Sequence, residues 1–403
     1  MRDEAVLDWL VIGGGIHGTA LSLRLLALGK VSRDRIRILD PHEALLARWS
    51  ANTSRCGMQH LRSPHVHHLD VDPWSLPRLA EARQDETEVL FQPYNRPSLE
   101  LFRSHCDGLL EELRLEEAHL RGRALSLQST AGGIRVESDR GALEAKRILL
   151  AVSASEHPRW PPWAKALRRQ GAAVVHVFDE DARMERWDAM PAVCVVGGGI
   201  TAVQTARRLA SQGKASVVLL ARQNLRLHYF DSDPCYLGPK CMKEFLKDRN
   251  YERRRRLIRA ARRPGTVPPD LAAALAKDVQ EGRIAFRTGE ISEAGAIPSG
   301  KVRLRIDNPP SELETDGVVL ATGFESARPG GELVEQAIEA FRLPCAPCGY
   351  PVLDEHLRWH PSIHVSGGLA ELELGPSARN IIGARRAGER IARNRKAEGG
   401  RRK

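Results

Sequence analysis

The 403-residue sequence has few aromatic side chains (5%), only seven scattered cysteines and no long uncharged apolar run. A membrane-spanning helix needs about 20 consecutive apolar residues, so the sequence predicts none. The first ten residues carry Asp3, Glu4 and Asp8, whereas a signal peptide begins with basic residues. Because the cysteine spacings form no disulfide framework, the sequence favours a reducing, cytoplasmic location. The 42% hydrophobic and 28% charged residues are typical of a globular protein.

A glycine-rich pattern occurs twice in the chain. The first copy reads WLVIGGGIHGTAL at 9–21, and the second reads VCVVGGGITAVQT at 193–205. In each copy a short apolar run precedes the glycines, and a segment with helical spacing follows them. Further apolar runs follow at 36–39 and 216–220. This order of strand, glycine turn, helix and strand is typical of a dinucleotide-binding unit.

Each glycine of the first turn has its own physical role. Gly13 permits the tight turn, Gly15 lets a pyrophosphate approach the backbone, and Gly18 lets the helix pack closely on the strand. The helix N-terminus then offers free N–H groups to the phosphates. We therefore expect cofactor contacts from residues of both turns: Gly13, Gly14, Gly15, Ile16, His17 and Gly18 in the first, and Gly197, Gly199, Ile200 and Thr201 in the second.

The residue at the end of each following strand distinguishes the two sites. The first strand ends at Asp40, whose carboxylate can accept hydrogen bonds from ribose hydroxyls. The second is followed by Arg222, whose planar guanidinium suits a 2′-phosphate. We expect an adenine dinucleotide with free ribose hydroxyls at the first turn and NADPH at the second. The alternative for Arg222 is a solvated surface charge.

These turns, together with Ala321-Thr322-Gly323, resemble the two-dinucleotide flavoprotein monooxygenases, and among them the lysine/ornithine N-monooxygenase-like family. Trp49, followed by Met58-Gln59, is similar to the family's stretch beside the flavin. The segment 175–178 is similar to its linker between domains and contains His176. Where the family has an Asn-Glu stretch that places the substrate, residues 230–240 read FDSDPCYLGPK. The resemblance therefore does not extend to ornithine or lysine as the substrate.

The resemblance implies an α/β fold with two Rossmann-like, three-layer nucleotide-binding domains. A discontinuous FAD domain would comprise residues 1–180 and 321–403, and the NAD(P)-binding domain, residues 181–320, would be inserted within it. The resemblance also implies that NADPH reduces FAD, that oxygen adds at flavin C4a, and that the hydroperoxide N-hydroxylates a small amine or amino acid. The implied partners are a small-molecule substrate and O2, with no membrane, and a homo-oligomer is left open.

The resemblance further assigns a role to several side chains. Gln59 would be the catalytic residue, with a hydrogen bond to the flavin or to retained NADP⁺; the alternative is an ordinary loop glutamine. The remaining expected cofactor contacts are Trp49, Ala321, Thr322, Gly323 and Gly367.

Two other constellations indicate different functions. Cys345-Ala-Pro-Cys348 has the spacing of a redox dithiol, which would suit an NADPH:acceptor flavin oxidoreductase. The arginines at 253–256 and 262–263, with a net charge of +10, would suit a non-catalytic nucleotide- or RNA-binding flavoprotein. We favour a solvated helix face for these arginines, so a nucleic-acid partner is the less favoured interpretation.

Two groups of potential metal or redox ligands have weaker patterns. Four histidines, His60, His65, His67 and His68, lie close together without a matching cysteine or carboxylate cluster, so we predict no metal site. Cys235 and Cys241 are not in a C-x-x-C arrangement, and we interpret them as ordinary thiols.

Overall fold

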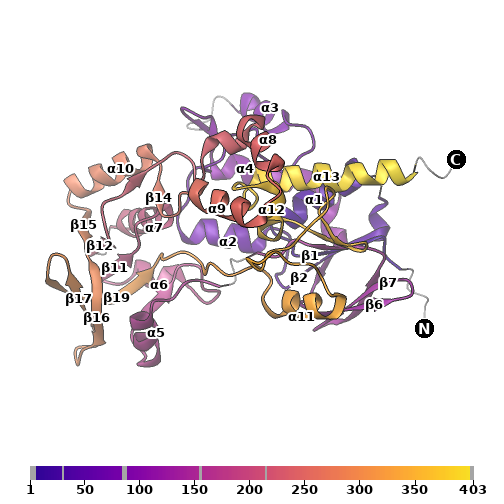
Figure 1. The fold of residues 1–403 in the computed structure, drawn as a ribbon. Helices are drawn as coiled ribbons and strands as arrows, with labels where there is room; N and C mark the ends of the chain where they lie inside the picture. Colours follow the sequence, from indigo (N-terminus) through magenta and orange to yellow (C-terminus); the bar gives the residue numbers. More distant parts are fainter. Residues whose placement is uncertain (1–5, 30, 84–88, 154–156, 214–215, 400–403) are drawn as a thin grey trace.

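The computed structural model describes residues 6–29, 31–83, 89–153, 157–213 and 216–399. Its parallel strands form two sheets in separate halves of the molecule (Figure 1). The six-stranded sheet has the order β20-β21-β9-β1-β2-β5, and only β20 is antiparallel to its neighbour. The five-stranded sheet has the order β10-β19-β11-β12-β15 and is parallel throughout. The predicted α/β fold with two Rossmann-like halves is confirmed.

The strands of both sheets are short. Those of the first sheet are β1 (Trp9–Ile12), β2 (Ile36–Asp40), β5 (His119–Arg121), β9 (Ile148–Leu150), β20 (Arg358–His360) and β21 (Ile363–Val365). Those of the second are β10 (Val174–His176), β11 (Ala192–Val196), β12 (Ser216–Ala221), β15 (Ile284–Thr288) and β19 (Gly317–Leu320). Every residue of β1 and β19 is buried, as expected for strands that are covered on both faces.

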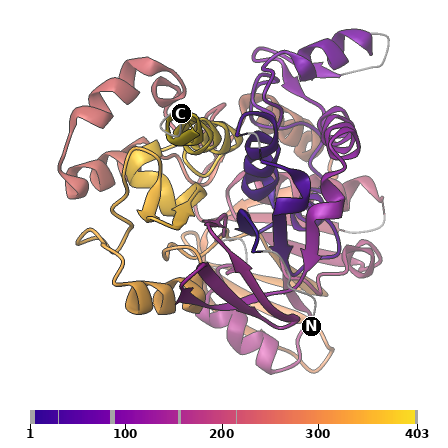
Figure 2. The same ribbon diagram turned by 90° about the vertical axis from the view of Figure 1, so that its right-hand side faces the viewer.

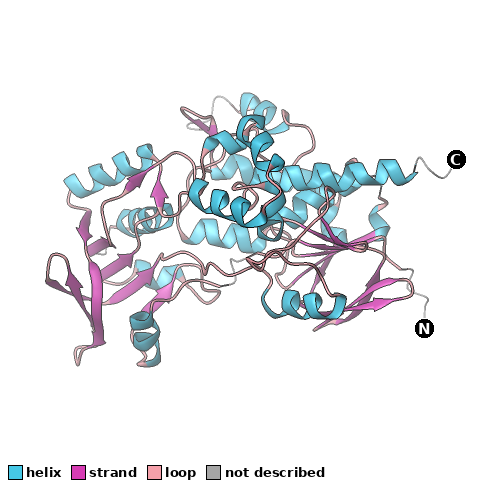
Figure 3. Cartoon of the chain, in the orientation of Figure 1, coloured by secondary structure: helices cyan, strands magenta, loops and turns pink. Residues whose placement is uncertain are grey.

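Helices cover these sheets, and smaller sheets pack beside them (Figure 3). In the first half, α1 lies against α13, which Figure 2 shows almost end-on. The helices of this half are α1 (Ile16–Ala27), α2 (Ala47–Arg55), α3 (Ser75–Ala82), α4 (Leu99–Glu112), α11 (Gly331–Phe341), α12 (Glu371–Leu374) and α13 (Ile381–Gly399). Those of the second half are α5 (Pro162–Arg169), α6 (Met184–Asp188), α7 (Ile200–Ser211) and α10 (Pro269–Gln280).

The smaller sheets are antiparallel except for one two-stranded pair. Two of them have three strands each: β6 (Ala124–Thr130), β7 (Gly133–Ser138) and β8 (Gly141–Ala145), and β16 (Glu290–Ala296), β17 (Val302–Asp307) and β18 (Ser311–Thr315). The two-stranded sheets are β3 (Leu90–Phe91) with β4 (Arg96–Pro97), and the parallel pair β13 (Arg226–Leu227) with β14 (Thr266–Val267).

The chain leaves the first sheet after β9 and returns to it after β19. The outgoing and returning segments are tied together, because Arg159 N–H donates to Gly323 O at 2.9 Å and Thr322 Oγ1 donates to Arg159 O. Phe178, just after β10, stacks on Phe324 with ring centroids 5.1 Å apart. The second sheet includes β10, so it begins before residue 181, where the domain boundary was predicted.

The helices α8 (Pro239–Lys247) and α9 (Tyr251–Ala261) belong to the inserted segment but pack on the returning chain. Arg254 and Arg255, on α9, are only 3% and 9% exposed and form ion pairs with Glu373 and Glu371. The prediction that this arginine run is one solvated face is therefore wrong, because two of its members bridge α9 to α12. No helix of the described ranges is both long and apolar enough to cross a membrane.

Candidate functional site

A cavity of about 2090 Å³ lies where the two halves of the molecule meet. Pockets that hold one drug-sized ligand measure roughly 300–1,000 Å³, so this one has room for more than one such ligand. Most of the residues that were singled out in the sequence line it: Gly13, Gly15, Ile16, His17, Asp40, Trp49, Gly197, Gly199, Ile200, Thr201, Arg222, Ala321, Thr322, Gly323 and Gly367. Gly14, Gly18 and Gln59 are not among the lining residues.

The geometry of the first glycine turn fits a bound pyrophosphate. Gly13 has φ +107°, and a Cβ there would lie 2.7 Å from Ala151 O. A Cβ on Gly18 would overlap the Gly13 carbonyl oxygen, so α1 needs a glycine to lie so close to the turn. A Cβ on Gly15 would meet no atom within 4 Å, so the backbone is open at this point. No side chain caps the N-terminus of α1 and its first turn has no acid, which leaves its N–H groups free for an anion.

Asp40 is oriented at the end of β2 by two backbone hydrogen bonds. Gly14 N–H donates to its Oδ2 at 2.6 Å, and His42 N–H donates to its Oδ1 at 2.9 Å. The residue is only 8% exposed and lines the cavity. Each carboxylate oxygen accepts more than one hydrogen bond, so Asp40 retains acceptor capacity for ribose hydroxyls.

His17 lies in the first turn of α1 and lines the same cavity. Its Nδ1 is 2.9 Å from Ser366 Oγ, and burial lowers its pKa to about 4. The ring is therefore neutral at pH 7, and it places no positive charge beside the free N–H groups of the helix. Gly367, whose φ of +62° is in the left-handed region that favours glycine, lies against the ring, and a Cβ there would be in ordinary van der Waals contact with it at 3.7 Å.

The second glycine turn is built in the same way, but the segment that contains Gly265 lies against it. A Cβ on Gly197 would lie 2.5 Å from Ala321 O, and a Cβ on Gly199 would lie 3.1 Å from Gly265 Cα. No side chain caps α7, and its first residues line the cavity. Arg222 follows β12, is exposed, lines the cavity and has no ion pair with any described residue. Its guanidinium is thus available to a phosphate.

The three residues taken from the family resemblance occupy different environments. Trp49 lines the cavity and packs on Phe102, with ring centroids 5.3 Å apart. His176 is fully buried at the end of β10, and burial lowers its pKa to about 4. Gln59 is exposed, and its backbone carbonyl accepts a hydrogen bond from Leu99 N–H. The catalytic role of Gln59 stays a prediction, and its side chain does not line the cavity.

A smaller pocket of about 250 Å³, which we call the side pocket, adjoins the cavity. The two share Ile16, Trp49, Arg62, Asp231 and Arg379 as lining residues. No motif or spacing in the sequence predicts this pocket. The available signal was the segment 230–240, which differs from the family's pattern and contributes Asp231 and Ser232 to the wall.

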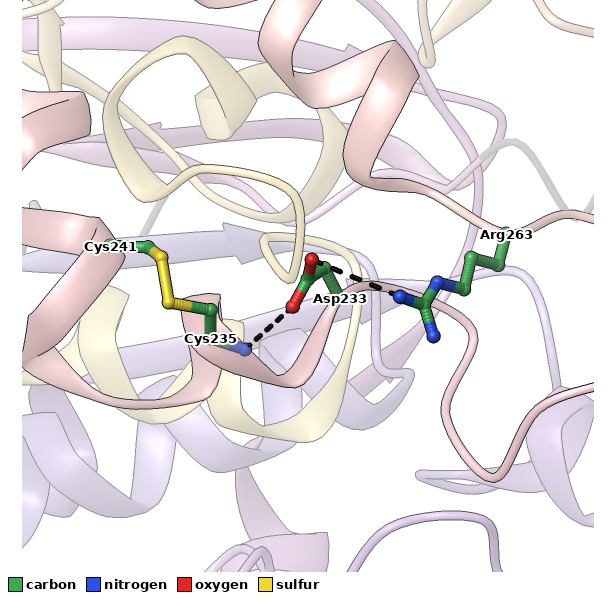
Figure 4. The surroundings of a disulfide bond; sticks show 4 residues. All are labelled: Asp233, Cys235, Cys241 and Arg263. Atoms are coloured by element: carbon green, nitrogen blue, oxygen red, sulfur yellow. Dashed lines mark hydrogen bonds and ion pairs between the residues drawn. A yellow bond between two sulfur atoms is a disulfide. The ribbon is translucent and has the colours of Figure 1, made fainter.

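One pair of cysteines differs from the prediction in its bonding. Cys235 and Cys241 form a disulfide, so their interpretation as ordinary thiols is wrong (Figure 4). The 3-10 turn Pro234–Leu237 and α8 bring their Cα atoms to 5.4 Å, which the sequence spacing does not reveal. Asp233 accepts a hydrogen bond from Cys235 N–H at 2.9 Å and lies 3.8 Å from Arg263.

The structure gives little support to a redox dithiol or a metal site at the cavity. Cys345 and Cys348 are free thiols, neither lines the cavity or the side pocket, and burial raises the pKa of Cys345. Because the thiolate is the reactive form, Cys345 is not activated. Within the described part of the chain, no three His, Cys, Asp or Glu side chains are grouped to hold a metal ion.

Several solved structures have the same fold. A cadaverine monooxygenase from Erwinia amylovora, solved with FAD, has a TM-score of 0.75 at 15% identity, covering 98% of this chain and 95% of that one. An ornithine N-hydroxylase from Kutzneria sp. 744, solved with reduced FAD, NADP⁺ and L-ornithine, has a TM-score of 0.74 at 15% identity, with 98% and 100% covered. An L-lysine 6-monooxygenase from Pseudomonas syringae has a TM-score of 0.72 at 18% identity, with 97% and 99% covered.

Among curated proteins, none matches this chain in sequence. The sequence pattern of one family, however, matches almost the whole chain, residues 7–388. With two dinucleotide turns lining one cavity, the chain is an FAD- and NAD(P)-dependent oxidoreductase, and it belongs to the pyridine nucleotide-disulphide oxidoreductase family.

Proposed function

We propose that this protein is an NADPH- and FAD-dependent monooxygenase that N-hydroxylates a small amine or amino acid. The overall reaction is R–NH2 + O2 + NADPH + H⁺ → R–NHOH + H2O + NADP⁺. The observation that carries the proposal is a single cavity that reaches both uncapped helix N-termini, α1 and α7, and adjoins a small pocket of substrate size. The cadaverine, ornithine and lysine monooxygenases of the same fold support it.

In this proposal the chain's own residues bind and orient the reactants. The N–H groups at the start of α1 bind the FAD pyrophosphate, and Asp40 accepts hydrogen bonds from its ribose. Those at the start of α7 bind the NADPH pyrophosphate, and Arg222 binds the 2′-phosphate. Ile16 and Trp49 line both the cavity and the side pocket and give the passage between the two an apolar border. The bound FAD supplies the oxygen chemistry, which the protein itself does not provide.

The alternative is a flavin reductase that passes electrons to Cys345 and Cys348. The position of these thiols outside the cavity lining gives no support to it. The cytoplasmic location stays a prediction, and the Cys235–Cys241 disulfide counts against it, since disulfides are rare in that compartment.

The test uses the purified, FAD-reconstituted protein. Anaerobic NADPH should bleach the flavin, and in air an amine substrate should yield a hydroxylamine at the expense of NADPH and O2. The double variant Cys345→Ser, Cys348→Ser should behave like the wild type. A protein that binds no flavin, or that gives no hydroxylamine with any amine, contradicts the proposal. Loss of NADPH oxidation in the double variant would instead support the dithiol reductase.

A further inference from the structure

Four arginines lie at or beside the opening between the large cavity and the side pocket, and we call them the arginine cluster: Arg62, Arg255, Arg262 and Arg379. All four line the large cavity, and Arg62 and Arg379 also line the side pocket. Asp231 lines both spaces as well, and a β-bridge between Ser232 and Arg262 holds Arg262 beside that segment. The cluster therefore borders the passage from one space to the other.

The cluster has more positive charge than its carboxylates balance. Glu371, only 1% exposed, forms ion pairs with two of the four guanidinium groups. Asp231 is the second carboxylate, and its charge acts on the other two. Asp270 also acts on Arg62 but is already paired with Arg96 at 2.8 Å. Two carboxylates thus balance four guanidinium groups, and a cleft with such a surplus of one sign attracts ligands of the opposite charge.

Arg262 is the member of the cluster without a partner of its own. The residue is half-buried, and within the described part of the chain its guanidinium forms no hydrogen bond and no ion pair. Burial, and next the charge of Arg379, lower the pKa of Arg262, and Asp231 only partly opposes them. A cation whose pKa falls on folding destabilises the folded state while it is charged. Such a charge is typical of a binding site whose ligand provides the counter-charge.

Arg62 and Arg379 are held by the protein and still have N–H groups to offer. Arg62 Nε donates to Tyr229 O at 2.7 Å, and its Nη1 donates one hydrogen bond, to Thr266 O at 3.4 Å. Arg379 Nε donates to Glu371 Oε2 at 3.0 Å, and no hydrogen bond to a described residue uses its Nη1. Each guanidinium has five N–H groups, so both retain donors in a fixed orientation. An oxyanion can bind such donors without breaking the existing hydrogen bonds.

We infer that the arginine cluster holds a doubly charged oxyanion of the substrate, so that the favoured substrate is an amine that carries a phosphate or phosphonate group. The unused N–H groups of Arg62, Arg262 and Arg379 donate to its oxygens. A phosphate monoester carries a charge of about −1.5 to −2 at pH 7, which matches the surplus of the cluster. This inference rests on the proposed function, since it concerns the group that accompanies the hydroxylated amine. Lysine, ornithine and diamines have a net positive charge at pH 7, which the cluster disfavours.

A binding experiment tests the cluster without turnover. The FAD-reconstituted protein, with saturating NADP⁺ to fill the dinucleotide phosphate sites, is titrated calorimetrically with three amines of the same chain. These are 3-aminopropylphosphonate, 4-aminobutyrate, in which a carboxylate replaces the phosphonate, and 1-aminopropane, which has no acid. We expect the phosphonate to bind at least about tenfold more tightly than the carboxylate, because it brings a second negative charge, and 1-aminopropane to bind most weakly.

Turnover in air should follow the same order. Hydroxylamine formation and NADPH consumption should give a kcat/KM at least about tenfold higher for 3-aminopropylphosphonate than for 4-aminobutyrate. Lysine and 1,5-diaminopentane, which bring net positive charge to the cluster, should be poorer substrates than the phosphonate.

Variants on one helix end separate recognition from folding. Arg262→Gln should weaken the binding of 3-aminopropylphosphonate by about tenfold and leave that of 1-aminopropane unchanged. It should not lower the Tm of the protein without the amine, because it removes a charge that has no partner. The matched control is Arg256→Gln, which makes the same change of charge on α9 at an exposed position outside both linings. This control should bind the phosphonate like the wild type.

The outcomes distinguish this inference from the proposed function. If an amine is N-hydroxylated but the phosphonate binds no better than 4-aminobutyrate, the proposed function stands and the inference is overturned. Equal binding of the phosphonate by Arg262→Gln and Arg256→Gln also overturns it. So does an equal loss of affinity for NADP⁺ and for the phosphonate in Arg262→Gln, since the cluster would then serve the dinucleotide. If the phosphonate binds as expected but no amine yields a hydroxylamine, the oxyanion site stands and the proposed N-hydroxylation fails.

Discussion

The two glycine turns of this protein have the same backbone plan but differ at three positions. The third small residue is Gly18 in the first turn and Ala202 in the second, and the residue before it is His17 or Thr201. The strand end also differs: β2 ends at Asp40, whereas β12 ends at Ala221 and is followed by Arg222. The first change alters how closely the helix packs, and the second alters what titrates at the turn. We expect the third to alter which ribose the site accepts, so that one plan gives two sites of different selectivity.

The packing difference gives the largest expected effect. Because a Cβ at position 18 would overlap the Gly13 carbonyl, Gly18→Ala must push α1 away from the turn. We expect a loss of about 3 kcal/mol of stability and of most of the bound flavin. The reverse change, Ala202→Gly, should cost only about 1 kcal/mol through the helix backbone. Urea unfolding and the flavin content of the purified variants measure both effects.

Equal losses in Gly18→Ala and Ala202→Gly would contradict this difference between the turns. Retention of full flavin content in Gly18→Ala would show that α1 can shift without harm, and that the tight contact does not shape the first site.

The strand-end residues should separate the two cofactors. Arg222→Ala should raise KM for NADPH by about tenfold or more and leave that for NADH nearly unchanged, because only NADPH has a 2′-phosphate. Asp40→Asn should weaken FAD binding and leave the NADPH-to-NADH ratio as it was. Steady-state kinetics with both nicotinamides and a flavin titration test the pair. An equal effect of Arg222→Ala on NADPH and NADH would mean that Arg222 is a solvated charge.

Local features of the fold were predictable from the sequence. The glycine turns, their flanking strands and helices, and the strand-end residues Asp40 and Arg222 lie within about 30 residues of one another in each copy, so spacing alone predicts their relation. The structure places them around one cavity. The roles of these residues in cofactor binding stay predictions.

Features that depend on distant segments were not predictable in this way. The side pocket joins Ile16, Asp231 and Asn380, which no sequence spacing relates to one another. The burial of Arg254 and Arg255 depends on acids more than 100 residues away on α12, whereas the sequence shows only a run of like charges. Cys235 and Cys241 are close in sequence, but their disulfide depends on the 3-10 turn Pro234–Leu237, which the sequence spacing does not reveal.

The titratable residue of the first turn gives the smallest predicted effect. The pKa of His17 is lowered from 6.5 to about 4, so between these values the unfolded chain binds a proton that the folded chain does not. Stability should therefore fall as the pH drops from 6.5 towards 4, with His17 contributing at most about 1.4 kcal/mol per pH unit, and nothing above pH 6.5. Urea unfolding at several pH values should show a shallower dependence for His17→Gln. Thr201→Gln, at the equivalent position of the second turn, should keep the wild-type dependence, since no proton is bound there. If both variants keep the wild-type slope, the turns differ in packing and in ribose selection but not in titration.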